Sequence, residues 1–177
     1  MCCAGWLLMG VAPRIPGGVE RFHKSLIPVM SSNSQNGYTI AANTYYNESR
    51  FPLWHAFDGN TILGGFSDTT NGSTLYMGAS NKDPIIDITF PKRVSVSGVL
   101  ILASTSDAAG VGSPRDYLLS YYDDSTGAYK TQKFGVITGT SGTDYDVSDT
   151  LSVRSNKWRL TIYRKAEFVG VNQIILF

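Results

Sequence analysis

Aromatic residues stand beside planar polar residues at several places in the chain, each within a stretch that reads as a loop or a turn. A flat aromatic ring can cover the C–H face of a sugar, and guanidinium, amide or carboxylate groups can each reach two hydroxyls at once. This combination is typical of carbohydrate recognition. The candidate ligand-binding residues are Tyr46, Arg50, Phe66, Tyr76, Arg115 and Phe168.

These residues also have structural explanations. One of the adjacent Tyr45 and Tyr46 can point into a strand-built core, and Phe168 can equally pack against it. Arg115 and Asp116 can form a local ion pair, which contributes little to stability when it is exposed. The sequence leaves both explanations open.

A second candidate site is FPLWHAFDGN, residues 51–60. Trp54 and Phe57 are spaced as on one face of a helical turn, which predicts a compact apolar turn that closes one end of a sandwich. The Asp-Gly-Asn that follows predicts a tight loop, because Gly permits positive φ and Asn tolerates it. The aspartate can either accept hydrogen bonds from the loop's own amides or bind a hard cation.

Residues suited to catalysis are sparse. The two histidines, His23 and His55, fall in a predicted linker and in the apolar turn. The sequence has neither a His-Glu-x-x-His pattern nor a nucleophile elbow, and GVGSPRD lacks the lysine of a phosphate-binding loop. The aspartates at 123–124 and 144–149 fit solvated turns. We therefore expect no enzymatic activity.

Composition narrows the class of protein. The net charge is +1 and the basic residues are scattered, so we expect no nucleic-acid partner. Charged residues make up 16%, below the usual ~25%, while 18 glycines and 10 tyrosines favour an all-β protein with many turns.

The N-terminal segment differs from the rest. Cys2 and Cys3 are the two cysteines, so a core disulfide is not expected, which favours a bacterial, viral or cytoplasmically made protein. CCAGWLLMGVA is apolar but too short to span a bilayer, so we expect no membrane insertion. No Lys or Arg precedes it, which favours an apolar arm that packs on a neighbouring subunit over a signal peptide.

From Tyr38 onward the pattern is that of strands. IIDITF, residues 85–90, alternates, and Pro84 before it and Pro91 after it are predicted to stop the strand. VSVSGVLILA, residues 94–103, changes from alternation to a continuous apolar run, as a strand entering a core does. Further strands are predicted at residues 117–122, 129–137, 158–163 and 171–177. Short strands between turn-rich segments indicate a β-sandwich or jelly roll. The predicted domains are an apolar arm and Pro/Gly linker at residues 1–30 and a sandwich at residues 31–177.

Four segments in order resemble the discoidin, or coagulation-factor five/eight type C, superfamily, which includes the family 32 carbohydrate-binding modules. They are YYNESRFPLWHAFDGN, DPIIDITFPKRVSVSGVLIL, SPRDYLLSYY and WRLTIYRKAEFVGVNQIILF. The resemblance covers roughly residues 38–177. It is nearest to versions in bacteriophage tail and baseplate proteins. It implies an eight-stranded antiparallel jelly-roll β-sandwich of the galactose-binding type, whose loops at one end bind a ligand.

The resemblance also implies a structural calcium ion at the turn. By position its ligands would be the carbonyls of His55 and Asn60, the carboxylate of Asp58, and a side chain near the final strand, where Gln173 stands. Leu63 and Gln173 replace a threonine and a glutamate of the family pattern, which removes one formal charge. Calcium affinity follows ligand charge, so the site should be weak or empty.

The function that this resemblance implies is carbohydrate binding without catalysis. Phe168 matches the position of the family's aromatic platform, whereas the His–Arg–Asn trio of galactose-binding relatives is not reproduced, since Phe66 falls near the His position and no Arg lies near Ser104. We expect a virion component that contacts host-surface glycans and binds other virion subunits, or its own copies, through residues 1–30. The alternatives are a purely structural assembly protein, and a secreted or cell-surface bacterial protein.

Overall fold

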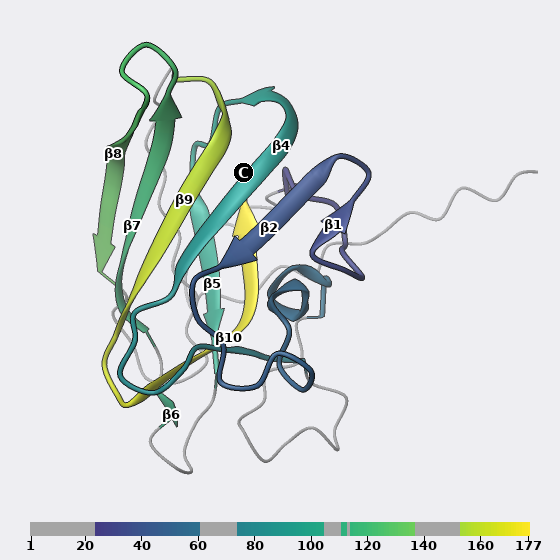
Figure 1. The fold of residues 1–177 in the computed structure, drawn as a ribbon, viewed down its shortest axis with the longest axis vertical. Helices are drawn as coiled ribbons and strands as arrows, with labels where there is room; N and C mark the ends of the chain where they lie inside the picture. Colours follow the sequence, from purple (N-terminus) through teal and green to yellow (C-terminus); the bar gives the residue numbers. More distant parts are fainter. Residues whose placement is uncertain (1–23, 61–73, 105–110, 113, 137–152) are drawn as a thin grey trace, which may run out of the picture.

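The computed structural model describes residues 24–60, 74–104, 111–112, 114–136 and 153–177. Ten strands form two sheets there, with one 3-10 helix, η1 (Leu53–Phe57). The larger sheet, in front in Figure 1, has six strands in the order β1 (Ser34–Gln35), β2 (Tyr38–Ala42), β4 (Ile85–Val94), β9 (Ser155–Arg164), β7 (Pro114–Asp123) and β8 (Ala128–Val136). The smaller has β3 (Tyr76–Met77), β10 (Phe168–Leu176) and β5 (Val99–Ala103), with β6 (Val111–Gly112) also paired to β10.

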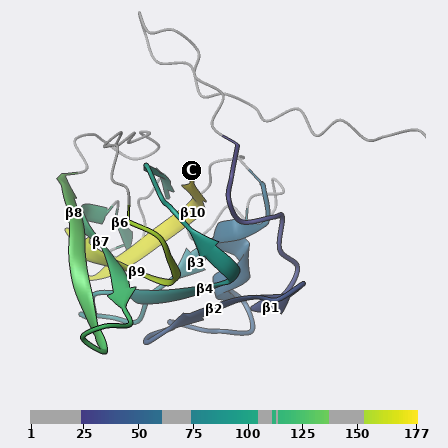
Figure 2. The same cartoon turned by 90° about the horizontal axis from the view of Figure 1, so that it is seen from above.

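The predicted all-β antiparallel sandwich is confirmed. In Figure 1 β5 and β10 lie behind the larger sheet, and the view from above in Figure 2 sets β10 apart from β2 and β4. The strand count differs in detail from the predicted eight, because β1, β3 and β6 have two residues each and seven strands are longer. Among the described strands, only β6 and β10 pair in parallel.

The segment VSVSGVLILA is divided between the two sheets, contrary to the single predicted strand. Val94 ends β4 opposite Ser155, whereas Val99 begins β5 opposite Leu176. All five side chains of β5 are buried, which explains why the alternation gives way to a continuous apolar run. The predicted stop at Pro91 is also wrong, because β4 continues to Val94. Pro91 falls within an irregularity of the β4–β9 ladder, where its missing N–H breaks no ladder bond.

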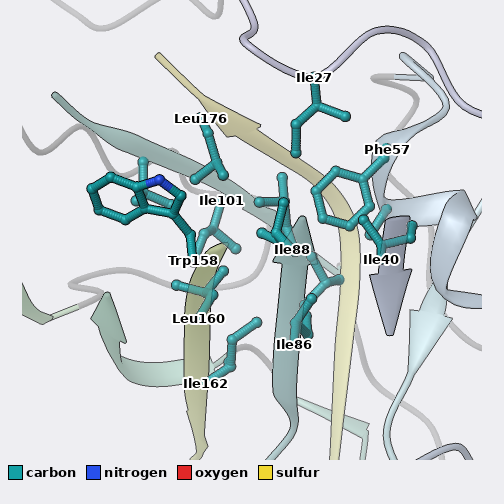
Figure 3. Close-up of a cluster of buried hydrophobic side chains, with 14 of the residues drawn as sticks. Ile27, Ile40, Phe57, Ile86, Ile88, Ile101, Trp158, Leu160, Ile162 and Leu176 are labelled. Atoms are coloured by element: carbon teal, nitrogen blue, oxygen red, sulfur yellow. The ribbon is translucent and has the colours of Figure 1, made fainter. Parts of the chain in front are cut away.

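Side chains from both sheets fill the space between the layers, as Figure 3 shows for the residues it labels. β4 contributes Ile86 and Ile88, and β9 contributes Trp158, which is fully buried. The indole N–H of Trp158 donates to the Ser155 carbonyl at 3.0 Å, so its one polar atom keeps a partner inside the core. The apolar part of FPLWHAFDGN forms η1 and buries Phe57 in this core, as predicted.

The sandwich includes residues on the N-terminal side of the predicted boundary at residue 30. Ile27 and Met30 are 4% and 1% exposed and belong to the core. The Leu26 N–H donates to the Leu176 carbonyl at 2.7 Å, and the Met30 N–H donates to the Phe57 carbonyl at 3.0 Å. The packed domain therefore extends at least to Leu26. Most of the predicted arm, residues 1–23, lies outside the described residues.

Within the described ranges, no helix has the length and apolar character needed to cross a membrane.

Candidate functional site

Three connecting segments meet at one end of the sandwich: the segment before η1, the one between β3 and β4, and the β9–β10 connection. Backbone hydrogen bonds hold them in register. The Tyr46 N–H donates to the Met77 carbonyl at 2.9 Å, and the Gly78 N–H donates to the Val169 carbonyl at 3.1 Å. Side chains from segments distant in sequence are thereby fixed side by side.

Tyr46, Phe51 and Phe168, with Arg50 beside them, form what we call the aromatic cluster. Tyr46 meets Phe168 edge to face with ring centroids 5.2 Å apart, and its ring lies 6.2 Å from that of Phe51. The Arg50 guanidinium lies over the Phe51 ring at 4.9 Å. Phe51 is 1% exposed whereas Tyr46 is 47% exposed, so a buried base supports an accessible ring.

A local turn presents Tyr46 and Arg50 on the same side of the domain. The Asn47 side-chain oxygen accepts hydrogen bonds from the Ser49 hydroxyl at 2.7 Å and from the Arg50 N–H at 3.2 Å. The Asn47 carbonyl also accepts from the Phe51 N–H at 2.8 Å. Asparagine is favoured in such turns because its side chain satisfies nearby amides.

A polar pocket with a volume of about 610 Å³ shares the β9–β10 connection with the aromatic cluster, since Glu167 in its wall is followed directly by Phe168. Such a volume is in the range of small-molecule sites, about 300–1,000 Å³. The polar residues that line it come from β7, the β3–β4 connection, the end of β9 and the β9–β10 turn. They are Asn81, Asp83, Arg115, Arg164, Lys165 and Glu167.

Internal hydrogen bonds hold the walls of the polar pocket. Asp83 Oδ1 accepts from the Arg164 N–H at 3.0 Å, and Arg164 Nη1 donates to Asn81 Oδ1 at 2.8 Å. The Glu167 carboxylate accepts from the Ser80 hydroxyl at 2.6 Å. These bonds couple the β3–β4 connection to the end of β9, so the pocket is built from both.

The Asp58 turn has the geometry of an Asx-type structural turn. Gly59 has a φ of 76°, and Asp58 Oδ1 accepts from the Asn60 N–H at 2.8 Å. Burial raises the pKa of Asp58 above its ordinary value. His55 Nδ1 lies 3.3 Å from the Leu75 carbonyl, so the imidazole is used within the fold.

Two buried amide oxygens belong to β10. Asn172 donates through Nδ2 to the Thr74 carbonyl at 2.7 Å. Its Oδ1 and the Oε1 of Gln173 are buried and have no hydrogen-bond partner among the described residues. Within the same residues, no group of three or more His, Cys, Asp and Glu side chains comes together, so any cation site there has few charged ligands.

The structure brings together three of the predicted ligand-binding residues, Tyr46, Arg50 and Phe168, and places Arg115 in the adjoining polar pocket. Tyr76 requires a correction. It is 0% exposed and its hydroxyl donates to the Thr44 carbonyl at 2.7 Å, so it is a core residue that a ligand does not reach. Phe66 lies outside the described residues, as does Leu63, which stands where the family pattern has a threonine ligand.

Several site residues were not selected from the sequence: Phe51, Asn81, Asp83, Lys165 and Glu167. Asn81 and Asp83 belong to a short turn, NKD, that looks like any solvated connection. Their relation to Lys165 and Glu167 arises from strand pairing between distant segments. The one local signal for a binding site was the Arg-Lys-Ala-Glu-Phe run that begins at the end of β9, where charged residues stand beside an aromatic residue.

No family model matches the sequence, and no curated protein matches it. Solved structures do match. The family 32 carbohydrate-binding module of NanJ from Clostridium perfringens, solved with galactose, has a TM-score of 0.60 at 15% identity, over 79% of this chain and 93% of that one. The F5/8 type C domain of a Bacteroides fragilis protein has a TM-score of 0.61 at 10% identity, over 81% of this chain and 92% of that one. Chitosan-binding module 1 of a Paenibacillus chitosanase/glucanase has a TM-score of 0.60 at 16% identity, over 88% of this chain and 99% of that one. The chain thus has the galactose-binding-like β-sandwich fold of these domains.

Proposed function

We propose that the protein is a non-catalytic carbohydrate-binding domain and that its glycan contacts the aromatic cluster. The observation that carries this proposal is the exposed Tyr46 ring held edge to face on Phe168. Among the described residues, Tyr46 and Val29 are the two large hydrophobic side chains with high exposure. A rigidly supported, accessible ring beside a guanidinium group offers both surfaces that sugar recognition needs.

Solved domains of the same fold support this proposal, since some were determined with galactose or with GalNAc-β-1,3-galactose. In the polar pocket, the Asp83 carboxylate accepts from a backbone amide and the Glu167 carboxylate accepts from a serine hydroxyl, so both have structural partners.

A glycan array with the full 177-residue chain tests the proposal, followed by calorimetry on the best neutral ligand. Tyr46→Ala and Phe168→Leu should each weaken binding about tenfold or more, because each removes a flat ring worth roughly 1–3 kcal/mol of contact. Phe168→Leu retains apolar volume, so the domain stays folded. Tyr129→Ala, which removes a half-buried tyrosine from β8, is the control. Unchanged affinity in both site variants would refute this location, and an array without any ligand would refute the function.

We also propose that the Asp58 turn binds calcium weakly. The half-buried Asp58 carboxylate and the unpartnered Oδ1 of Asn172 are hard oxygen donors, which fit this ion. Asn172 bonds to Thr74, and the next residue, Leu75, is contacted by His55 of η1, so both donors belong to one neighbourhood. Asn172 thus replaces Gln173 as the preferred ligand from β10. Bound calcium would brace the turn and would take no part in a reaction.

The finer role that we propose is attachment. The protein would be a virion component that contacts host-surface glycans through the aromatic cluster and binds virion subunits or its own copies through its N-terminal segment. The sequence resemblance to phage tail domains and the apolar residues 6–9 support it. Light scattering should show that removal of residues 1–23 lowers the oligomeric mass. An unchanged mass would contradict an assembly role for this segment.

A further inference from the structure

The aromatic cluster and the polar pocket share one structural element, the β9–β10 connection. Glu167 lines the pocket and Phe168 belongs to the cluster. The Asn81 N–H donates to the Glu167 carbonyl at 2.8 Å, which fixes the opposite wall of the pocket to the same connection. A ligand longer than one sugar that lies on the aromatic cluster can therefore extend into the pocket.

The acceptor groups of the polar pocket are already engaged by the protein. Asp83 accepts from the backbone of Arg164, Asn81 Oδ1 accepts from its guanidinium, and Glu167 accepts from Ser80. Each of these groups therefore gives part of its acceptor capacity to the protein, although a carboxylate has two oxygens and about four lone-pair sites.

The donor groups have unused capacity. Arg115 uses Nε to donate to Asp116 at 2.5 Å, and its side chain is 61% exposed, whereas the Asp116 side chain beneath it is 11% exposed. A guanidinium carries five N–H donors, and among the described residues the two terminal nitrogens of Arg115 have no hydrogen-bond partner. Lys165 is exposed, and among the described residues its ammonium group has neither a hydrogen bond nor an ion pair.

We infer that the polar pocket binds an anionic substituent, a carboxylate or a sulfate, of a glycan whose neighbouring sugar lies on the aromatic cluster. This inference rests on the proposed function. Three cations, Arg115, Arg164 and Lys165, line the pocket against the two carboxylates of Asp83 and Glu167. Spare N–H donors on cations match the lone pairs of an anionic group, and hydrogen bonds between charged partners are about twice as strong as neutral ones.

Calorimetry on the full chain with three matched oligosaccharides tests the inference: a neutral galacto-oligosaccharide, an oligogalacturonide and a sulfated galacto-oligosaccharide. The acidic ligands should bind about tenfold more tightly than the neutral one at low salt. Lys165→Gln should remove most of this difference. Lys165→Arg should retain it. The control is Lys92→Gln, an equal change of charge on an exposed residue toward the opposite end of β4 from Asp83.

The outcomes separate the two proposals. Preference for the carboxylate or for the sulfate identifies the substituent, and loss of that preference in Lys165→Gln and Arg115→Gln supports the pocket. Equal binding of all three ligands, or equal effects of Lys165→Gln and Lys92→Gln, would overturn the pocket while leaving the glycan-binding function intact. If acidic ligands bind in a Lys165-dependent way and Phe168→Leu has no effect, the pocket stands and the aromatic location fails.

Discussion

Gly135 in β8 lies directly against the ring of Tyr117 in β7. A Cβ atom built on Gly135 would approach three atoms of the Tyr117 ring and hydroxyl at 2.3–2.4 Å, far closer than side-chain carbons come to neighbours. Tyr117 is 0% exposed and belongs to the core between the sheets. The absence of a side chain at residue 135 is therefore what allows this tyrosine its position in the core.

Gly135→Ala should therefore lower the free energy of unfolding by about 1–3 kcal/mol, because the added methyl group forces Tyr117 or the strand to shift. Thermal or urea denaturation measures the change. Thr131→Ala, an exposed position on the same strand, is the matched control and should change stability little. A melting temperature for Gly135→Ala equal to that of the parent protein would contradict the close approach.

Tyr76→Phe should affect stability and leave ligand binding alone. The variant removes the hydroxyl that donates to the buried Thr44 carbonyl, and an unsatisfied buried acceptor costs roughly 1–3 kcal/mol. Tyr46→Phe should leave stability nearly unchanged, because that ring is 47% exposed. Denaturation and glycan titration on both variants check this. Loss of affinity in a stably folded Tyr76→Phe protein would restore Tyr76 to the ligand-binding residues.

Asp58→Asn should stabilise the protein at neutral pH in the presence of EDTA. Burial raises the pKa of Asp58 above its ordinary 3.8, so the stability linked to this carboxyl is present below the unfolded-state pKa and is lost as pH rises through the folded-state pKa. The amide variant keeps an oxygen that can accept from the Asn60 N–H. Its advantage over the parent protein should be larger at pH 7 than at pH 3, as measured by melting temperature.

In the presence of calcium, the parent protein should become more stable than Asp58→Asn. If the Asp58 turn binds the ion, calcium should raise the melting temperature of the parent protein and have less effect on Asp58→Asn. Asn172→Leu should lose the same calcium response, because it removes the unpartnered Oδ1 from β10. Magnesium serves as the control ion, since it demands stricter octahedral geometry. An equal response of the parent protein and Asp58→Asn to calcium would count against the site.

Removal of residues 1–23 should leave the described domain folded, whereas removal of residues 1–30 should destabilise it. The second deletion takes away Ile27 and Met30, which are buried in the core. Met30→Ala in the full chain should cost about 2–5 kcal/mol, the usual range for a fully buried large side chain. Val29→Ala, at a 50% exposed neighbour, is the control. Equal melting temperatures for the two deletions would show that residues 24–30 do not contribute to stability.

Local patterns in the sequence predicted the elements well wherever one face or both faces of a strand are buried. IIDITF alternates because Ile86 and Ile88 enter the core while Asp87 faces outward, where it pairs with Arg159. The apolar turn was predictable because η1 buries Phe57 at helical spacing from Trp54. VSVSGVLILA passes from one sheet to the other, and in the sequence only Gly98 indicates this change.

The candidate site was predictable in part. Tyr46 and Phe168 stood out as aromatic residues in turns, but only the tertiary structure shows that their rings meet, because hydrogen bonds between distant segments bring them together. Tyr76 carried the same aromatic signal and proved to be buried. An aromatic residue in a short strand looks alike in sequence whether it faces a core or a ligand, because both surfaces are apolar.

The sequence by itself determined the all-β class, the apolar turn before Asp58 and the aromatic character of the connecting segments, because periodicity and turn chemistry act over a few neighbouring residues. The tertiary structure alone decided that Ile27 and Met30 belong to the core, that Asn81 and Glu167 lie together, and that Phe168 supports Tyr46. These relations depend on which strands pair and in what register. Strand pairing is fixed by burial of the whole core and not by any single segment.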